Sequence, residues 1–235
     1  MKLAIFCGLI SLLILKAEAA MREIPRTTGK VESGITLTKE NLTKEVELYF
    51  KKEKPGVETW NITHGYNYHR EPPVTATVKN FKYKNDCRWS KNFDYNYCKS
   101  IHVWYLIKGI VTPFKLFVNV SLPLFGNKEE IFWFDLNNAT SAYWNPDNVS
   151  YPPDYKSVSF KEECKFSVKV HFQGYITYTR KGLPRGDESE QDTVSVEKLE
   201  DKDIGFHKIG RNKLSYDVKG TYRHLVVCPP HQRSR

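Results

Sequence analysis

Five Asn-X-Ser/Thr triplets are the residues of this chain whose types and spacing most directly indicate a covalent chemistry. In such a triplet the side-chain amide nitrogen of asparagine can receive an N-linked oligosaccharide in the secretory pathway. None of the five has proline at its centre, so each keeps the acceptor pattern. The predicted N-glycosylation sites are Asn41, Asn61, Asn119, Asn138 and Asn148.

The first 19 residues have the pattern of a secretory signal peptide. Lys2 supplies positive charge, Leu3–Leu15 is almost entirely apolar, and Ala17-Glu18-Ala19 offers small residues for cleavage. About 13 apolar residues fall short of the roughly 20 that a membrane-spanning helix needs. We therefore expect residues 1–19 to be removed and residues 20–235 to be secreted to the extracellular space without a transmembrane segment.

The cysteines predict two disulfide bonds. Cleavage of the leader removes Cys7 and leaves an even number of cysteines for an oxidising compartment. Of the three pairings, we favour Cys87 with Cys98, which closes a short loop, and Cys164 with Cys228, which ties down the C-terminus. Disulfide formation would exclude cysteine catalysis, and the spacing lacks the paired C-X2-C units of a structural zinc site.

No residue pattern in the chain indicates an enzyme. The histidines are scattered, and His64 and His69 flank Gly-Tyr-Asn-Tyr without the H-E-X-X-H arrangement of a zinc protease. The chain also lacks a G-X-S-X-G elbow, a phosphate-binding Walker loop and a dinucleotide-binding glycine motif. We therefore expect no catalytic residue, no metal site and no cofactor.

The densest group of candidate binding residues lies between Lys79 and Lys99, where cationic side chains are interleaved with aromatic rings. Aromatic and arginine side chains are common interface anchors, and cations steer anionic partners. The alternative is a hairpin with its aromatic side chains inward and its lysines in water. A second aromatic cluster, at 132–134 and 143–144, is expected to be buried. The residues predicted to contact a partner are Lys82, Lys84, Arg88, Trp89 and Lys91.

The charge balance points to anionic partners. The chain has a formal net charge of +9, and loss of Lys2, Lys16 and Glu18 with the leader lowers it by one. Outside the cell, such a balance favours glycosaminoglycans, acidic proteins or lipid headgroups over nucleic acid as partners. The alternative is that the charge serves only to keep the protein soluble.

Strands are predicted to position these groups, because apolar and polar residues alternate with a period of two. The alternation is clearest at 164–172 and at 114–122, where Asn119 and Ser121 fall on the outer face and leave room for a glycan. Other predicted strands are Val57–Thr63, Val74–Tyr83, Ile101–Ile110, Glu130–Leu136, Ser157–Phe160, Lys213–Val218 and Tyr222–Cys228.

A single all-β domain is the predicted fold, mainly an antiparallel barrel or sandwich with one short N-terminal helix. The helix is predicted at Lys39–Lys52, although several of these residues would also alternate in a strand. The polar stretch at 181–211 is expected to be a mobile loop, with one helical turn near Val194–Leu199. By its length, the secreted part forms one domain.

In its leader, basic body, cysteine number, abundant sequons and tyrosine- and lysine-rich strands, the whole chain resembles the salivary immunosuppressant glycoproteins of ixodid ticks. The resemblance implies a secreted salivary glycoprotein that binds a host factor or cell-surface protein and suppresses T-lymphocyte responses. It implies no catalytic residues.

The alternative is similarity to tick-type lipocalins, which would imply a scavenger of a small amine or lipid. In that plan a helix precedes an eight-stranded barrel, and a disulfide ties back the C-terminus. Lys39–Lys52 and a Cys164–Cys228 bond would fit it, but the Gly-X-Trp of typical lipocalins is absent near the first strand.

Overall fold

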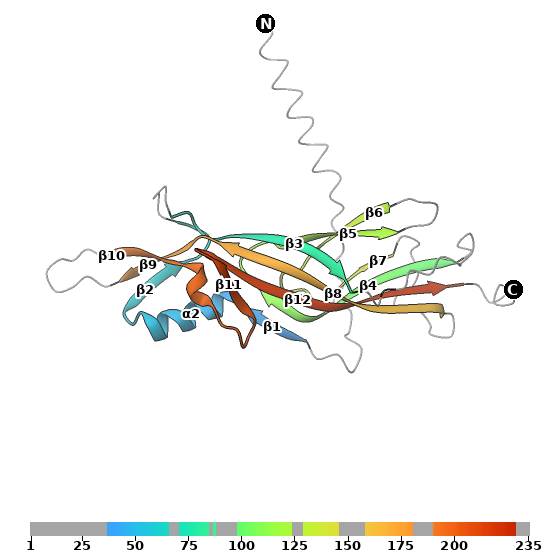
Figure 1. Cartoon of the computed structure of the whole chain (residues 1–235), viewed down its shortest axis with the longest axis horizontal. Helices are drawn as coiled ribbons and strands as arrows, with labels where there is room; N and C mark the ends of the chain where they lie inside the picture. Colours follow the sequence, from blue (N-terminus) through green and yellow to red (C-terminus); the bar gives the residue numbers. More distant parts are fainter. Residues whose placement is uncertain are drawn as a thin grey trace, which may run out of the picture.

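A computed structural model describes residues 37–65, 71–84, 87, 98–123, 129–145, 158–180 and 190–228. These residues form one long sheet, two smaller sheets, one α-helix and one 3-10 helix (Figure 1). The predicted all-β fold with one helix is confirmed. The described strands are divided among three sheets and do not close into one barrel.

The long sheet contains β1 (Thr38–Asn41), β3 (Thr75–Tyr83), β4 (Lys99–Val111), β7 (Ser141–Trp144), β8 (Val158–Gln173), β11 (Phe206–Gly210) and β12 (Lys213–Val227). Its main path runs β1-β4-β12-β8-β3, with β11 beside β12 and β7 beside β4. All of these pairs are antiparallel except that of β1 with β4. In Figure 1, β3, β8 and β12 run along the long axis of the molecule.

The alternation predicted for β8 is observed. Phe166, Val168 and Phe172 are buried, whereas Lys165 and Lys169 on the opposite face are exposed. The strand is longer than expected, because the predicted segments at 157–160 and 164–172 form one continuous strand that ends at Gln173. The chain then turns at Gly174, whose φ of 132° suits glycine, and enters β9.

β12 is likewise one strand, although two strands were predicted on either side of Lys219 and Gly220. The register with β4 shifts between these two residues, so the break expected from the sequence is a β-bulge within a continuous strand. Gly220 lies opposite Phe166 of β8, and a side chain at this position would collide with the Phe166 ring and with the Tyr105 carbonyl oxygen.

The second sheet has the order β10-β9-β2 and contains β2 (Val57–Asn61), β9 (Tyr175–Arg180) and β10 (Glu190–Ser195). The helix α2 (Leu42–Glu53) lies at the same end of the molecule (Figure 1). Asn41 starts the helix, because its side-chain oxygen accepts hydrogen bonds from the backbone N–H groups of Thr43 and Lys44. Its buried face carries Leu42, Val46 and Phe50, which confirms the helical pattern over the strand-like one.

The prediction of a mobile polar loop at 181–211 was wrong for residues 190–211. Residues 181–189 lie outside the described part of the chain. This segment forms β10, the 3-10 helix η3 (Val196–Leu199) and β11, and η3 confirms the predicted helical turn. The apolar side chains of the segment are few, but they reach the core. The buried ones are Val194, Val196, Leu199, Ile204 in part, and Phe206.

The prediction of two disulfides among the four cysteines is confirmed, but the favoured pairing was wrong. The bonds join Cys87 to Cys164 and Cys98 to Cys228. Strand register explains the outcome. Lys99 pairs with Val227 at the edge of β4 and β12, so the preceding and following cysteines meet. Cys87 comes just after β3, which pairs with β8, the strand that carries Cys164.

We predict that Gly220→Ala lowers the free energy of unfolding by about 1–3 kcal/mol, because the added methyl group overpacks the contact with Phe166. Gly210→Ala is the matched control, since a Cβ there would make only ordinary contacts with Lys213. Urea denaturation of both variants measures the difference. Equal stabilities of the two variants would contradict the close approach of β12 to β8.

Candidate functional site

Six exposed lysines gather on the outer face of three adjacent strands of the long sheet, β12, β8 and the edge strand β3. We call this set the lysine face; its members are Lys79, Lys82, Lys165, Lys169, Lys213 and Lys219. The register places Lys79 beside Lys169 and places Ser167 between Lys82 and Lys219. Because directly opposed side chains in a sheet are about 4.5–5.5 Å apart at Cβ, these ammonium groups share one local field.

A β-bulge in β3 increases the density of polar groups on this face. The register shifts between Lys79 and Lys82, and Asn80 adopts a φ of 46°, a conformation that asparagine tolerates better than most residues. As a result, Lys79, Asn80 and Lys82 are all exposed, while Phe81 points inward and stacks on Phe166 at 5.2 Å between ring centroids.

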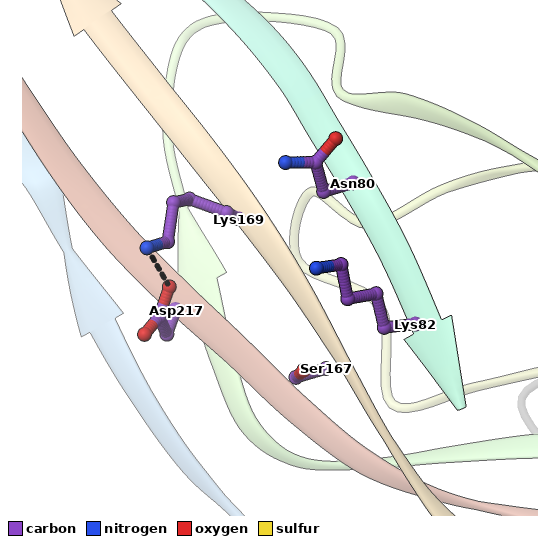
Figure 2. A pocket seen from close by; sticks show the side chains of 5 residues that line it. All are labelled: Asn80, Lys82, Ser167, Lys169 and Asp217. Atoms are coloured by element: carbon purple, nitrogen blue, oxygen red, sulfur yellow. Dashed lines mark ion pairs between the residues drawn. The ribbon is translucent and has the colours of Figure 1, made fainter. Parts of the chain in front are cut away.

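An open depression of about 200 Å³ lies in the middle of the lysine face. Figure 2 shows Asn80 and Lys82 extending from β3 toward the neighbouring strand β8, which contributes Ser167 and Lys169. The carboxylate of Asp217 on β12 lies 3.9 Å from the Lys169 ammonium nitrogen. Both side chains are more than 40% exposed, so this ion pair is weak and leaves Lys169 able to exchange partners.

His171 lies beside the depression on the same face of β8. Partial burial and the nearby charges of Lys169 and Lys79 lower the pKa of His171, although Asp217 acts in the opposite direction. The neutral imidazole is therefore favoured at neutral pH, and the positive charge of this face comes from its lysines. The arrangement offers ammonium, amide and hydroxyl donors to an anion.

The structure tests only part of the predicted partner-binding set. Lys82 and Lys84 are exposed, whereas Arg88, Trp89 and Lys91 lie outside the described residues. The aromatic residues of β3 follow the alternative interpretation, in which aromatic side chains point inward and lysines point to water. Phe81 packs inward, and the hydroxyl of Tyr83 accepts a hydrogen bond from Trp104 Nε1. The expected Cys87–Cys98 bond that would have shaped the following loop is absent, because Cys87 is bonded to Cys164.

Lysines of β8 and β12 were missed in the sequence analysis. Their alternation marked them as outward, but nothing in the sequence indicated that β3 and β12 both flank β8. Only that pairing joins Lys82 with Lys165, Lys169 and Lys219 on one surface.

Four of the five predicted glycosylation sites lie in the described residues; Asn148 does not. Asn119 is exposed on β5 (Phe117–Pro123), as predicted, and Asn61 is exposed at the end of β2. Asn138 is exposed and accepts a hydrogen bond from Lys39 Nζ, whereas Asn41 is half-buried as the helix cap. The predicted acceptors Asn61, Asn119 and Asn138 are therefore accessible to solvent.

The second aromatic cluster is only partly buried, in contrast to the prediction. It lies on β6 (Glu129–Asp135) and on β7. Phe132 and Phe134 are buried, but Trp133, which points to the opposite face of the hairpin, is 51% exposed. Tyr143 and Trp144 are half-buried.

A pair of buried histidines lies on the inner face of the long sheet, away from the lysines. His102 and His224 face each other across β4 and β12, and their rings stack at 4.5 Å between centroids. His102 Nδ1 is hydrogen-bonded to the Tyr222 hydroxyl at 2.7 Å, and its Nε2 has no hydrogen-bond partner within the described residues. A second proton on this ring would therefore be poorly accommodated.

Among the described residues, no group of three or more His, Cys, Asp or Glu side chains is arranged to hold a metal ion. In the same part of the chain, no helix has the length and apolar character required to traverse a bilayer.

Comparison with known proteins gives no family assignment, because no family model and no curated protein matches the chain. Solved structures give weaker likenesses. The crystal structure of the Cry23Aa1 and Cry37Aa1 binary protein complex matches with a TM-score of 0.47 and 10% identity, over 81% of this chain and 86% of that chain. A non-toxic crystal protein from Bacillus thuringiensis matches with a TM-score of 0.42 and 12% identity, over 81% of this chain and 94% of that chain. Likenesses at this level support no conclusion about function.

We predict that the buried histidines make stability fall in mild acid. Burial lowers the pKa of His224 from 6.5 to about 4, and burial together with the charge of His224 holds the pKa of His102 well below its usual value. Below about pH 6.5 the unfolded chain takes up protons that the folded chain excludes, so stability falls by up to about 1.4 kcal/mol per pH unit for each histidine.

Urea denaturation from pH 7 to pH 4.5 measures this loss. The variant His224→Gln should show a shallower pH dependence than the parent and than His207→Gln, the same substitution at an exposed position. The same slope in all three proteins would contradict the assignment to the buried pair.

Proposed function

We propose that this chain is a secreted, glycosylated protein that binds an anionic host factor or cell-surface receptor through its lysine face. By this binding it suppresses T-lymphocyte responses. The observation that carries the binding part is the exposure of six lysines on one face of β3, β8 and β12. The leader-like N-terminus, the sequons and the two disulfides support export.

Electrostatics favours an acidic partner over a basic one. Lysines at neighbouring positions of β3 and β8 repel each other, so an arriving carboxylate or sulfate group relieves that repulsion. The same field accelerates the encounter with an anionic partner and opposes one with a basic partner. A glycosaminoglycan and an acidic receptor surface both have the required charge.

The sheet provides a preorganised support for this contact. Directly behind the lysines, Val168, Phe166 and Val218 are buried, and β8 is hydrogen-bonded to a strand on each side. The lysine side chains remain flexible, but their Cα positions are fixed before the partner arrives. Binding therefore costs little backbone entropy.

No observation favours the alternative of a lipocalin-like carrier of an amine or lipid. That function requires a sizeable enclosed cavity with a few convergent polar groups. In the described residues, the inner face of the long sheet is filled by large side chains, among them Trp104, Phe166 and Tyr222. The disulfide that ties down Cys228 also leads to Cys98, not to Cys164.

The binding part is tested by removing four charges from the lysine face, with Lys82, Lys165, Lys169 and Lys219 each replaced by serine. Since an exposed ion pair contributes about 0.2–1 kcal/mol, we expect affinity for heparin to fall roughly tenfold, with a flatter dependence on salt. The matched control removes four exposed lysines elsewhere, through Lys44→Ser, Lys51→Ser, Lys52→Ser and Lys202→Ser. Equal retention of the two variants on a heparin column would contradict the assignment to this face.

The immunosuppressive part is tested on mitogen-stimulated T cells. The purified glycoprotein should lower their proliferation, and the lysine-face variant should do so less than the control variant at the same concentration. Well-folded protein that leaves proliferation unchanged would remove this part of the proposal while leaving the heparin result standing.

A further inference from the structure

A stripe of exposed apolar side chains lies on the outer face of the hairpin formed by β5 and β6. Phe117, Ile131 and Trp133 are 45%, 57% and 51% exposed. The inner face of the same hairpin belongs to the hydrophobic core, where its apolar side chains are buried: Val118, Val120, Phe132 and Phe134. Neighbouring exposed apolar residues on one surface indicate that something covers them.

The register of the hairpin places a glycan acceptor in the middle of this stripe. Asn119 lies directly opposite Trp133, and Ser121 of the same sequon lies opposite Ile131. Phe117 is two residues before Asn119 and therefore shares its face. With opposed Cβ atoms about 4.5–5.5 Å apart, a group attached to Asn119 begins within reach of all three apolar side chains.

We propose that the N-linked oligosaccharide of Asn119 lies back across this hairpin and that its first sugar rings cover Trp133 and the flanking Phe117 and Ile131. The inference rests on the export part of the proposed function, because the oligosaccharide is added in the secretory pathway. It assigns a specific intramolecular role to one of the sequons.

The chemistry of a sugar suits this surface. One face of a pyranose ring presents C–H groups, whose partial positive charge is attracted to the negative face of an aromatic ring. The hydroxyl groups at the ring edge stay in water while the apolar area beneath is removed from it. Covalent attachment keeps the sugar at a high effective concentration beside Trp133, so a weak contact is sufficient to hold it.

The position of Asn119 also favours the oligosaccharide over a protein or a lipid surface as the group that covers the apolar stripe. A bulky polar oligosaccharide at the centre of the stripe would obstruct a protein partner or a lipid surface. Asn61 provides the contrast within the same chain. It is an exposed acceptor at a strand end, but it lies opposite Thr177, and the neighbouring pair on its strand joins the hydroxyls of Thr59 and Thr179.

The test uses the full chain secreted from eukaryotic cells, with site occupancy measured by mass spectrometry of glycopeptides. We compare Asn119→Gln with the control Asn61→Gln, each in the parent and in a Trp133→Ser background. The readouts are the fluorescence of a dye that binds exposed apolar surface and the thermal midpoint.

In the parent background, Asn119→Gln should raise dye fluorescence at least twofold and lower the thermal midpoint by about 2–4 °C, which corresponds to the loss of one modest contact. Asn61→Gln should change neither. In the Trp133→Ser background, the effect of Asn119→Gln should shrink by half or more, because the main contact surface is already gone. If Trp133→Ser is not secreted, Phe117→Thr replaces it as the background.

The inference is overturned by an Asn119 without glycan beside an occupied Asn61, by equal effects of the two asparagine variants, or by an undiminished effect of Asn119→Gln in the Trp133→Ser background. Binding of the fully glycosylated protein to phosphatidylcholine vesicles that is lost in Trp133→Ser would assign the stripe to a membrane and also overturn it. If neither Asn119 nor Asn61 carries glycan in the secreted chain, the inference is overturned, while the binding part of the proposed function is still tested by heparin affinity. A chain that is not secreted at all would instead contradict the export part of the proposed function.

Discussion

The pairing of β8 with a strand on each side is the constraint on which the rest of the structure depends. β8 is hydrogen-bonded to β12 along almost its whole length and to β3 over its second half. Its apolar residues therefore form one side of the core, and its lysines are held on the other. A slip by one residue would exchange the two faces and bury charge, so the alternating sequence and the ladder reinforce each other.

The same register determines the covalent and steric details. It brings Cys98 to Cys228 and Cys87 to Cys164, bonds that close long segments of chain and restrict the unfolded state accordingly. It also sets Gly220 against Phe166, where a side chain would have no room. The disulfide pairing and the requirement for glycine at position 220 thus both follow from one alignment of strands.

Two different outward surfaces arise from the same principle. On the long sheet, the outer positions of β3, β8 and β12 include six exposed lysines, and the bulge at Asn80 adds a further polar group. On the β5–β6 hairpin, the outer positions carry apolar side chains around a glycan acceptor. We propose that the first surface attracts an anionic partner through charge and that the second is covered by the oligosaccharide of Asn119. On this proposal, recognition and the shielding of apolar surface belong to separate parts of the molecule.

The sequence by itself determined what depends on local pattern. Period-two alternation identified most of the long strands and placed Asn119 on the outer face, although it missed the short strands β1, β7, β10 and β11. The spacing of Leu42, Val46 and Phe50 identified the helix. Only the tertiary structure decided which strands are neighbours, and hence the disulfide pairing, the assembly of lysines from β3, β8 and β12, and the position of Asn119 opposite Trp133. It also ordered residues 190–211, whose few apolar side chains become anchors once a core exists to receive Val196 and Phe206. The physical reason is that strand pairing is nonlocal, so its partners are selected by the packing of the whole chain and not by the residues beside them.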